Sequence, residues 1–241
     1  MPCRLQSSRA LVTACLLVAG AARAEAPKEG ARAYFASVRR LEASRAQLAA
    51  AYREAKLPKD RSAVVGQARH RLSLTLFEEL IPAWYGTRWE FHGTSQTPGE
   101  GAIACGYFVS TVLRDAGFRV ERVRLARQAS EDIVKTLVPA RQIRRYRWKS
   151  PAELLAAVRA ELGDGLFVVG LDYHVGFLHL GGDGASFCHS AYLAPAAVVC
   201  EPAARAAGLA SDYYVVGRLL TAPTVARWLE GRAFRTLGAA R

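Results

Sequence analysis

The spacing of apolar residues changes from helical to strand-like in the second half of this chain, and this change constrains the fold more than any other feature. Before Leu166 the recognisable periodicity is helical, with apolar residues recurring every three to four positions. From Leu166 to Leu220 the apolar residues form short runs separated by turn residues, which predicts strands. Helices followed by a run of antiparallel strands is the pattern of an α+β domain.

Prolines and capping residues mark the ends of the predicted helices. Pro58 and Pro82 end the first two, which we expect to form a hairpin that packs on the rest of the chain. Residues 121–150 have no clear period, and the basic run over 141–149 favours a solvated loop. The predicted helices are residues 28–57, 62–80, 105–116, one that begins at Ser150-Pro151, and 225–237.

The predicted strands are short and mostly apolar. Gly181-Gly182-Asp183-Gly184 has the composition of a hairpin turn, so the strands on either side of it are expected to pair in antiparallel fashion. The predicted strands are residues 166–171, 174–180, 186–192 and 213–220.

The N-terminus has the pattern of an export signal. An apolar run over residues 10–22 follows two arginines, and Ala22-Arg23-Ala24 forms a small-x-small cleavage site before Glu25. The protein is therefore expected to be periplasmic or secreted. Lipoprotein acylation at Cys15 is the alternative, but the apolar run continues past this cysteine. No later segment approaches the ~20 apolar residues of a transmembrane span.

Composition excludes several classes of protein. Hydrophobic residues make up 51% of the chain and charged residues 22%, which excludes a disordered or fibrous protein. The 33 Lys and Arg residues exceed the 21 Asp and Glu residues, giving a net charge of +12. A positive net charge of this size favours an anionic binding partner. The basic residues are scattered and no nucleic-acid motif is present, so nucleic acid is not expected.

Removal of residues 1–24 would leave three cysteines, an odd number, and an odd number in an oxidising compartment leaves one thiol unpaired. Cys105 lies at the predicted N-terminus of a helix, where the helix dipole favours a thiolate, so it is the candidate nucleophile. A buried helix cysteine is the alternative. Cys188 is either a core cysteine or the disulfide partner of Cys200, and both possibilities stay open.

A cysteine nucleophile needs a base, which is usually histidine. Strand alternation places His174 and His179 on opposite faces of their predicted strand. The next strand returns beside it and brings His189 near His174, where it can hold the His174 ring by a hydrogen bond. The residues thus indicate a triad of Cys105, His174 and His189. The five histidines of the chain are His70, His92, His174, His179 and His189.

Several segments resemble the NlpC/p-sixty family of cell-wall cysteine peptidases, and the resemblance covers about residues 84–220. Three family features are matched: the nucleophile helix, the strand before the histidine, and the histidine hairpin. The matching segments are residues 103–110 (IACGYFVS) with 113–118 (LRDAGF), residues 162–168 (LGDGLFV), and residues 174–181 (HVGFLHLG) with 187–191 (FCHSA).

The resemblance implies a papain-like α+β fold in which the nucleophile helix packs on an antiparallel sheet. It implies a cysteine hydrolase of amide bonds, with peptidoglycan stem peptides as substrate and no cofactor or metal. Cys105 would be the nucleophile, His174 the base and His189 the polar third residue. The candidates for substrate or oxyanion contacts are Trp89, His92 and Gly106, with Gly106 standing where the family usually has serine.

The expected organisation is an export signal (1–24), a helical N-terminal segment (25–83), the hydrolase domain (84–220) and a C-terminal helix (221–241). Other functions stay open. The same fold also serves amidases and acyltransferases, and an inactive wall-binding module is a further alternative. Cys105, His174, Cys188 and His189 are of types that bind zinc, although Cys188 and His189 face opposite sides of one strand.

Overall fold

A six-stranded antiparallel sheet forms the centre of the molecule in the computed structural model, which describes residues 29–182 and 184–237. The predicted export signal and its lipoprotein alternative lie outside the described residues. The order of the strands is β1-β6-β2-β3-β4-β5. They comprise β1 (Ile143–Arg147), β2 (Gly165–Leu171), β3 (Val175–Gly181), β4 (Gly184–Ser190), β5 (Val198–Pro202) and β6 (Tyr213–Arg218).

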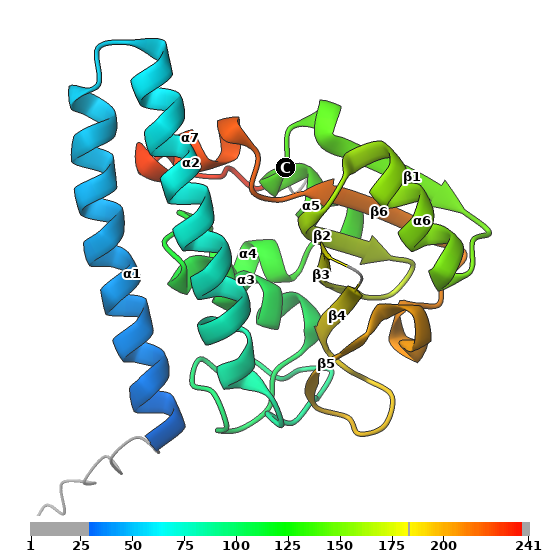
Figure 1. The fold of residues 1–241 in the computed structure, drawn as a ribbon. Helices are drawn as coiled ribbons and strands as arrows, with labels where there is room; N and C mark the ends of the chain where they lie inside the picture. Colours follow the sequence, from blue (N-terminus) through cyan, green and yellow to red (C-terminus); the bar gives the residue numbers. More distant parts are fainter. Residues whose placement is uncertain (1–28, 183, 238–241) are drawn as a thin grey trace, which may run out of the picture.

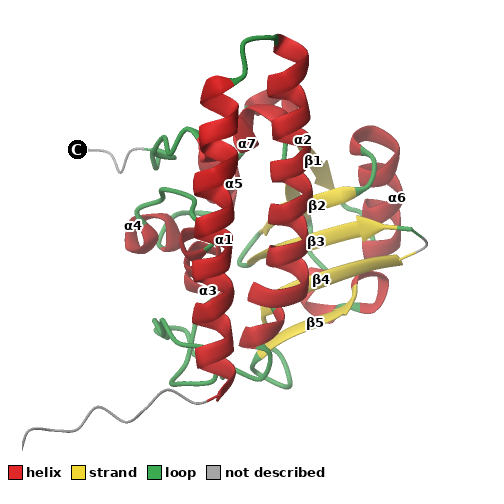
Figure 2. Ribbon diagram, turned by 60° about the vertical axis from the view of Figure 1, so that its left-hand side comes forward, coloured by secondary structure: helices red, strands yellow, loops and turns green. Residues whose placement is uncertain are grey.

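Helices cover both faces of this sheet (Figure 1). The long hairpin of α1 and α2 lies on one face together with α3, α5 and α7, and α6 lies on the other face (Figure 2). The arrangement is therefore α+β, as expected from the sequence. The helices are α1 (Glu29–Glu54), α2 (Pro58–Leu74), α3 (Cys105–Asp115), α4 (Arg122–Ala126), α5 (Ser130–Leu137), α6 (Pro151–Leu162) and α7 (Ala222–Leu229).

The continuous apolar run of β2 reflects burial on both faces of the sheet. Leu166 and Val168 belong to the core under the α1–α2 side, whereas Phe167 and Val169 belong to the core under α6. Successive side chains of a strand point to opposite faces, so a strand between two helical layers must be apolar at every position. The result is a molecule of three layers with two hydrophobic cores.

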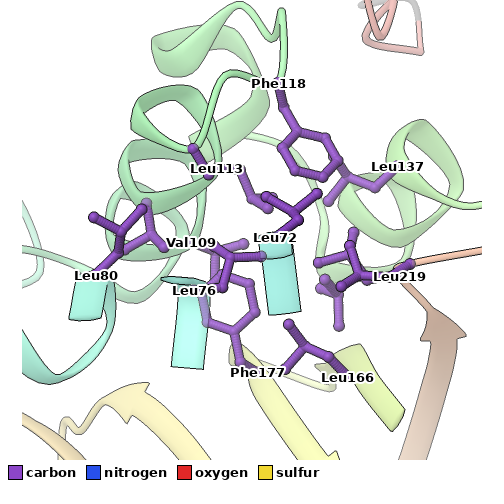
Figure 3. Close-up of a cluster of buried hydrophobic side chains, with 14 of the residues drawn as sticks. Leu72, Leu76, Leu80, Val109, Leu113, Phe118, Leu137, Leu166, Phe177 and Leu219 are labelled. Carbon is purple, nitrogen blue, oxygen red and sulfur yellow. The ribbon is translucent and has the colours of Figure 1, made fainter. Parts of the chain in front are cut away.

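The N-terminal helical segment shares the larger core with the sheet. Leu72, Leu76 and Leu80 meet Val109 of α3 and Phe177 of β3 in one buried cluster (Figure 3). The α-helix α2 ends at Leu74, and a π-helical turn over Thr75–Leu80 carries the predicted apolar stripe to its end. The hairpin predicted for residues 28–80 is thus present and packs on the sheet.

The start of α6 follows the sequence prediction closely. Ser150 accepts a hydrogen bond from the Glu153 backbone N–H, and the Glu153 carboxylate accepts one from the Ser150 N–H. Pro151 occupies the first helical position, where its missing N–H costs nothing. This capping box fixes where the helix begins.

The structure corrects the prediction of a solvated loop over residues 141–149. Residues Ile143–Arg147 form β1, an edge strand that pairs with β6. Ile143 and Tyr146 point into the two cores, and the arginines between them project outward. Dense charge on an edge strand opposes pairing with other chains, and this charge obscured the strand in the sequence.

Two further predictions need correction. The closing helix α7 ends at Leu229 rather than at residue 237, because Gly231 takes a left-handed conformation with φ of +62° and turns the chain. The second edge strand, β5, is absent from the predicted strands. No helix in residues 29–182 and 184–237 combines the length and the apolar character needed to span a bilayer.

A disulfide between Cys188 and Cys200 settles the alternatives for these two cysteines. They face each other directly across β4 and β5, so the bond joins an edge strand to its neighbour. Cys105 is the free cysteine of the described residues. The three cysteines of residues 29–182 and 184–237 therefore divide into one bonded pair and one thiol.

Breaking this disulfide is expected to lower the free energy of unfolding by about 3 kcal/mol, the value for a loop of this length in the chain-entropy treatment. Denaturant unfolding with and without reductant measures this loss, and the double variant Cys188→Ala/Cys200→Ala serves as the control that reductant must not affect. An unchanged midpoint on reduction would show that pairing of β4 and β5 alone holds the edge strand.

Candidate active site

Cys105 is the first residue of α3, and two hydrogen bonds hold the segment directly before it. The backbone N–H of Ala104 donates to the Gly93 carbonyl at 2.9 Å. The buried hydroxyl of Ser190, at the end of β4, donates to the Ile103 carbonyl at 2.6 Å. The bond from Ser190 ties the segment before the helix to β4, and the bond to Gly93 ties it to the loop around that residue, so the position of Cys105 is fixed relative to β4.

His174 lies directly before β3 and contacts His189 of β4. The Nε2 atom of His174 is 2.7 Å from the Nδ1 atom of His189, and both side chains are buried. The backbone N–H of Leu171 donates to the His174 carbonyl and closes the turn between β2 and β3. The hydrogen bond between these two histidines, which strand alternation predicted, is thus present.

Cys105 and His174 line the same pocket, which has a volume of about 860 Å³. Trp89, His92 and Gly106 also line it, so the structure brings these sequence-predicted residues together. His189 is 1% exposed and lies behind His174. The remaining lining residues are Phe91, Thr94, Ala104, Tyr107, Ala126, Arg127, Gln128, Tyr173 and Tyr192.

Gly106 is needed for packing beside the nucleophile. A Cβ atom at this position would lie well inside contact distance of the Ala126 carbonyl, at the end of α4. Serine, the usual residue at this position in the family that the sequence resembles, is therefore excluded by the backbone of α4. The close approach of α4 therefore explains why this chain has glycine at position 106.

Aromatic residues on one side of the pocket were not predicted as site residues. Tyr192 meets the His174 ring edge to face, with 5.2 Å between ring centroids, and also lies beside Trp89. Tyr173 and Phe91 are exposed at the pocket. Tyr173 precedes His174 in the sequence, and Tyr192 follows the segment 187–191 of the histidine hairpin. Their closeness in sequence to the two histidines was the one feature that could have marked them as site residues.

The electrostatic prediction for Cys105 is wrong in direction. Burial raises the pKa of its thiol above the ordinary value, although hydrogen bonding by the backbone amides of Gly106, Val175 and Cys105 itself lowers it. The thiolate is stabilised by the helix N-terminus as expected, but the loss of solvation is the larger effect. Cys105 is therefore a neutral thiol at neutral pH in the free protein.

His174 is neutral under the same conditions. Burial, with a smaller contribution from His189, lowers its pKa from 6.5 to about 3. A neutral imidazole has a lone pair and can accept a proton, whereas an imidazolium cannot. The resting site therefore holds a thiol and a neutral base, and thiolate must form by proton transfer during the reaction.

Alkylation of Cys105 is expected to require alkaline pH. Since its folded-state pKa is raised, the thiolate fraction at neutral pH is smaller than that of a free cysteine, and labelling should accelerate only as pH rises through the raised pKa. The rate of carboxamidomethylation by iodoacetamide from pH 6 to 11 measures this pKa, with the urea-unfolded protein as reference. A lower apparent pKa in the folded protein would restore the helix-dipole prediction.

His179 lies apart from this site. Its ring lies on Phe77 with 4.2 Å between centroids, and it is not among the residues that line the pocket. It is half-buried, and burial lowers its pKa. It therefore provides a histidine of the same chain segment as His174 that does not line the pocket with Cys105.

The zinc alternative is not supported by these residues. Cys188 is bonded to Cys200, so its thiolate is not available as a ligand beside His189. In the part of the chain that the structure describes, no three His, Cys, Asp or Glu side chains converge in a metal-binding cluster.

Comparisons with known proteins return no match for this chain, whether it is scanned against protein-family models or searched against curated proteins and solved structures. The functional conclusion therefore depends on the sequence and on the geometry described above.

Proposed function

We propose that this protein is an exported cysteine hydrolase of papain-like, NlpC/p-sixty type that cleaves an amide bond in the stem peptides of peptidoglycan. One observation carries the proposal. A cysteine at a helix N-terminus and a buried neutral histidine line the same pocket, and a second histidine is hydrogen-bonded to the first. A nucleophile, a base and a residue that orients the base are the parts of a catalytic triad.

In the first step, the proton of the Cys105 thiol passes to the imidazole of His174 as sulfur attacks the carbonyl carbon of the amide. The oxygen of the resulting tetrahedral intermediate carries negative charge. The backbone N–H of Cys105 is one of the four N–H groups that a helix leaves unpaired at its start, and in this mechanism it stabilises the oxyanion. The carbon–nitrogen bond then breaks, and the His174 imidazolium gives its proton to the leaving amine.

In the second step, water attacks the thioester carbonyl while His174 accepts one of its protons. The carbon–sulfur bond breaks, the carboxylic acid leaves, and that proton returns to the Cys105 sulfur. His189 orients the His174 ring in both steps through the 2.7 Å hydrogen bond. No metal or redox group takes part in this sequence of steps.

Charge and compartment support peptidoglycan as the substrate. The chain has an export-signal pattern, and removal of residues 1–24 with their three arginines would lower its net charge of +12 to +9 (12 − 3), while the cell wall is an extracytoplasmic anionic polymer. Arg127 lines the pocket together with Cys105, where it can contact a substrate carboxylate. A disulfide fits an oxidising compartment such as the periplasm.

Digestion of purified peptidoglycan tests this proposal. The protein is expected to release fragments with new amino and carboxyl termini within the peptide stems, identified by mass spectrometry, and Cys105→Ala is expected to release none. Peptidoglycan that stays intact, or that is cut only in its glycan strands, would contradict the proposal.

An amidase or acyltransferase acting on an apolar acyl group is the second candidate. The aromatic side chains of Trp89, Phe91, Tyr173 and Tyr192 at the pocket favour it, since such side chains bind apolar groups. N-acyl amino acids of increasing chain length distinguish the two candidates: turnover that rises with chain length supports this one.

A further inference from the structure

Glu201 extends the hydrogen-bonded series that begins at His174. The Nε2 atom of His189 lies 3.1 Å from Oε1 of Glu201, on the opposite side of the ring from the atom that contacts His174. Two buried imidazoles are thus linked to a carboxylate that is partly exposed to solvent. Neither the predicted triad nor the mechanism above uses this carboxylate.

The carboxylate determines where the ring protons lie. An ionised carboxylate only accepts hydrogen bonds, so the Nε2 atom of His189 must carry a proton. A neutral His189 then has a bare Nδ1, which can only accept, so the Nε2 atom of His174 must be the donor. In neutral His174 the remaining nitrogen, Nδ1, has a free lone pair.

We propose that Glu201 is a positioning residue of the active site, which fixes the tautomers of His189 and His174 so that Nδ1 of His174 accepts the proton of Cys105. This inference rests on the proposed hydrolase function. It adds to it a residue outside the triad and a specific atom for the proton transfer.

The sheet holds Glu201 in the position that this role needs. Phe187 of β4 lies directly opposite Glu201 of β5, and the adjacent pair in the register is the Cys188–Cys200 disulfide. Residues 187, 189 and 201 therefore lie on one face, and the disulfide on the other. The covalent bond prevents β5 from sliding along β4, so the carboxylate stays beside His189.

The His189 ring has little room to move away from Glu201. Phe187 stacks on it with 4.3 Å between centroids. A Cβ atom at Gly208 would lie 2.5 Å from Cε1 of His189, so the backbone of this glycine also lies close to the ring. The ring is thus fixed by packing, and its protons are fixed by the carboxylate.

The charge of Glu201 also favours the protonated intermediate. Burial lowers the pKa of His189, whereas Glu201 acts in the opposite direction. When His174 becomes an imidazolium, its Nε2–H donates to His189, and the carboxylate behind that ring stabilises the positive charge. Among the described residues, Glu201 contacts the His189 ring and forms no salt bridge with a lysine or arginine.

Nitrogen NMR of the protein labelled with ¹⁵N-histidine tests the proposal, because protonated and bare ring nitrogens have well-separated chemical shifts. In the wild type at neutral pH, both His174 and His189 are expected to carry their proton on Nε2. Glu201→Ala is expected to mix the tautomers of His189. Glu201→Gln should preserve them in part, since its amide oxygen still accepts a hydrogen bond.

Kinetics provide the second readout. Glu201→Ala is expected to lower kcat on peptidoglycan roughly 10-fold with little change in KM, and Glu201→Gln less. Glu161→Gln is the matched control, because Glu161 has similar exposure (44% against 38%) but pairs with Arg144, away from the histidines. This control should match the wild type.

A wild-type His189 with its proton on Nδ1 would overturn the proposal, as would a Glu201→Ala variant that matches Glu161→Gln in both tautomers and kcat. If Glu201→Ala does not fold, the wild-type spectrum alone still decides the proton positions. If the protein cleaves no amide bond, the proposed function fails while the tautomers still report whether Glu201 orders the histidines.

Discussion

Replacing Cys105 with alanine is expected to lower the rate of amide hydrolysis roughly 10⁴- to 10⁶-fold, the range seen when a nucleophile that acts within a triad is removed. The large effect follows from the mechanism, because no other described cysteine has a free thiol. Cys105→Ser should be nearly as inactive. A hydroxyl is a far weaker acid than a thiol, and the neutral His174 would have to remove a less acidic proton.

Initial rates on peptidoglycan, followed by the release of free amino groups, measure this effect. The thermal midpoint of each variant serves as the control, since the small change at the pocket wall should leave the fold and the Cys188–Cys200 disulfide intact. A Cys105→Ala variant that keeps more than about a hundredth of the wild-type rate would exclude a covalent role for this residue.

His174→Ala is expected to lower kcat about 10²- to 10⁴-fold, the usual contribution of a general base. His179→Ala is the matched comparison, because both histidines belong to the same segment but only His174 lines the pocket and contacts His189. His179 lies on Phe77, so its loss should affect packing slightly and catalysis hardly at all.

Steady-state kinetics of the two variants under identical conditions decide between these roles. His189→Ala should fall between them, since His189 orients the base without touching the substrate, and His189→Asn should retain more activity because its amide can still accept from His174. An inactive His179→Ala beside an active His174→Ala would mean that the catalytic base has been assigned to the wrong histidine.

The histidine pair was predictable because the features that create it are local. A glycine turn joins two short apolar strands, and a strand places alternate residues on one face. The antiparallel register of β3 and β4 then pairs Phe177 with Cys188, which brings His189 to the face of His174. The helix start at Cys105 was local in the same way.

Glu201 was not predictable without the disulfide. The strand β5 has only five residues, and its sequence VVCEP ends in proline, so it gives little strand signal of its own. Pairing Cys188 with Cys200 places β5 beside β4 and puts the residue after each cysteine on a common face. The sequence left this pairing open, and the carboxylate beside His189 therefore stayed hidden.

The pKa of Cys105 shows a different limit of sequence reasoning. The helix N-terminus lowers the pKa of a thiol, and its position was read correctly from the sequence. Burial depends on what covers the helix start, which includes Val175 and the segment around Ala126. These residues are distant in sequence, so the larger of the two effects appears only in the folded structure.

The most direct test of a catalytic Cys105 is to titrate activity against its alkylation. Samples treated with increasing iodoacetamide at alkaline pH are assayed on peptidoglycan, and the modified fraction of Cys105 is determined in the same samples by peptide mass spectrometry. Activity is expected to fall in proportion to that fraction and to reach zero at one modified cysteine per molecule, with the Cys188–Cys200 disulfide intact. A protein whose Cys105 is fully alkylated and that still cleaves its substrate would contradict a catalytic role for this cysteine.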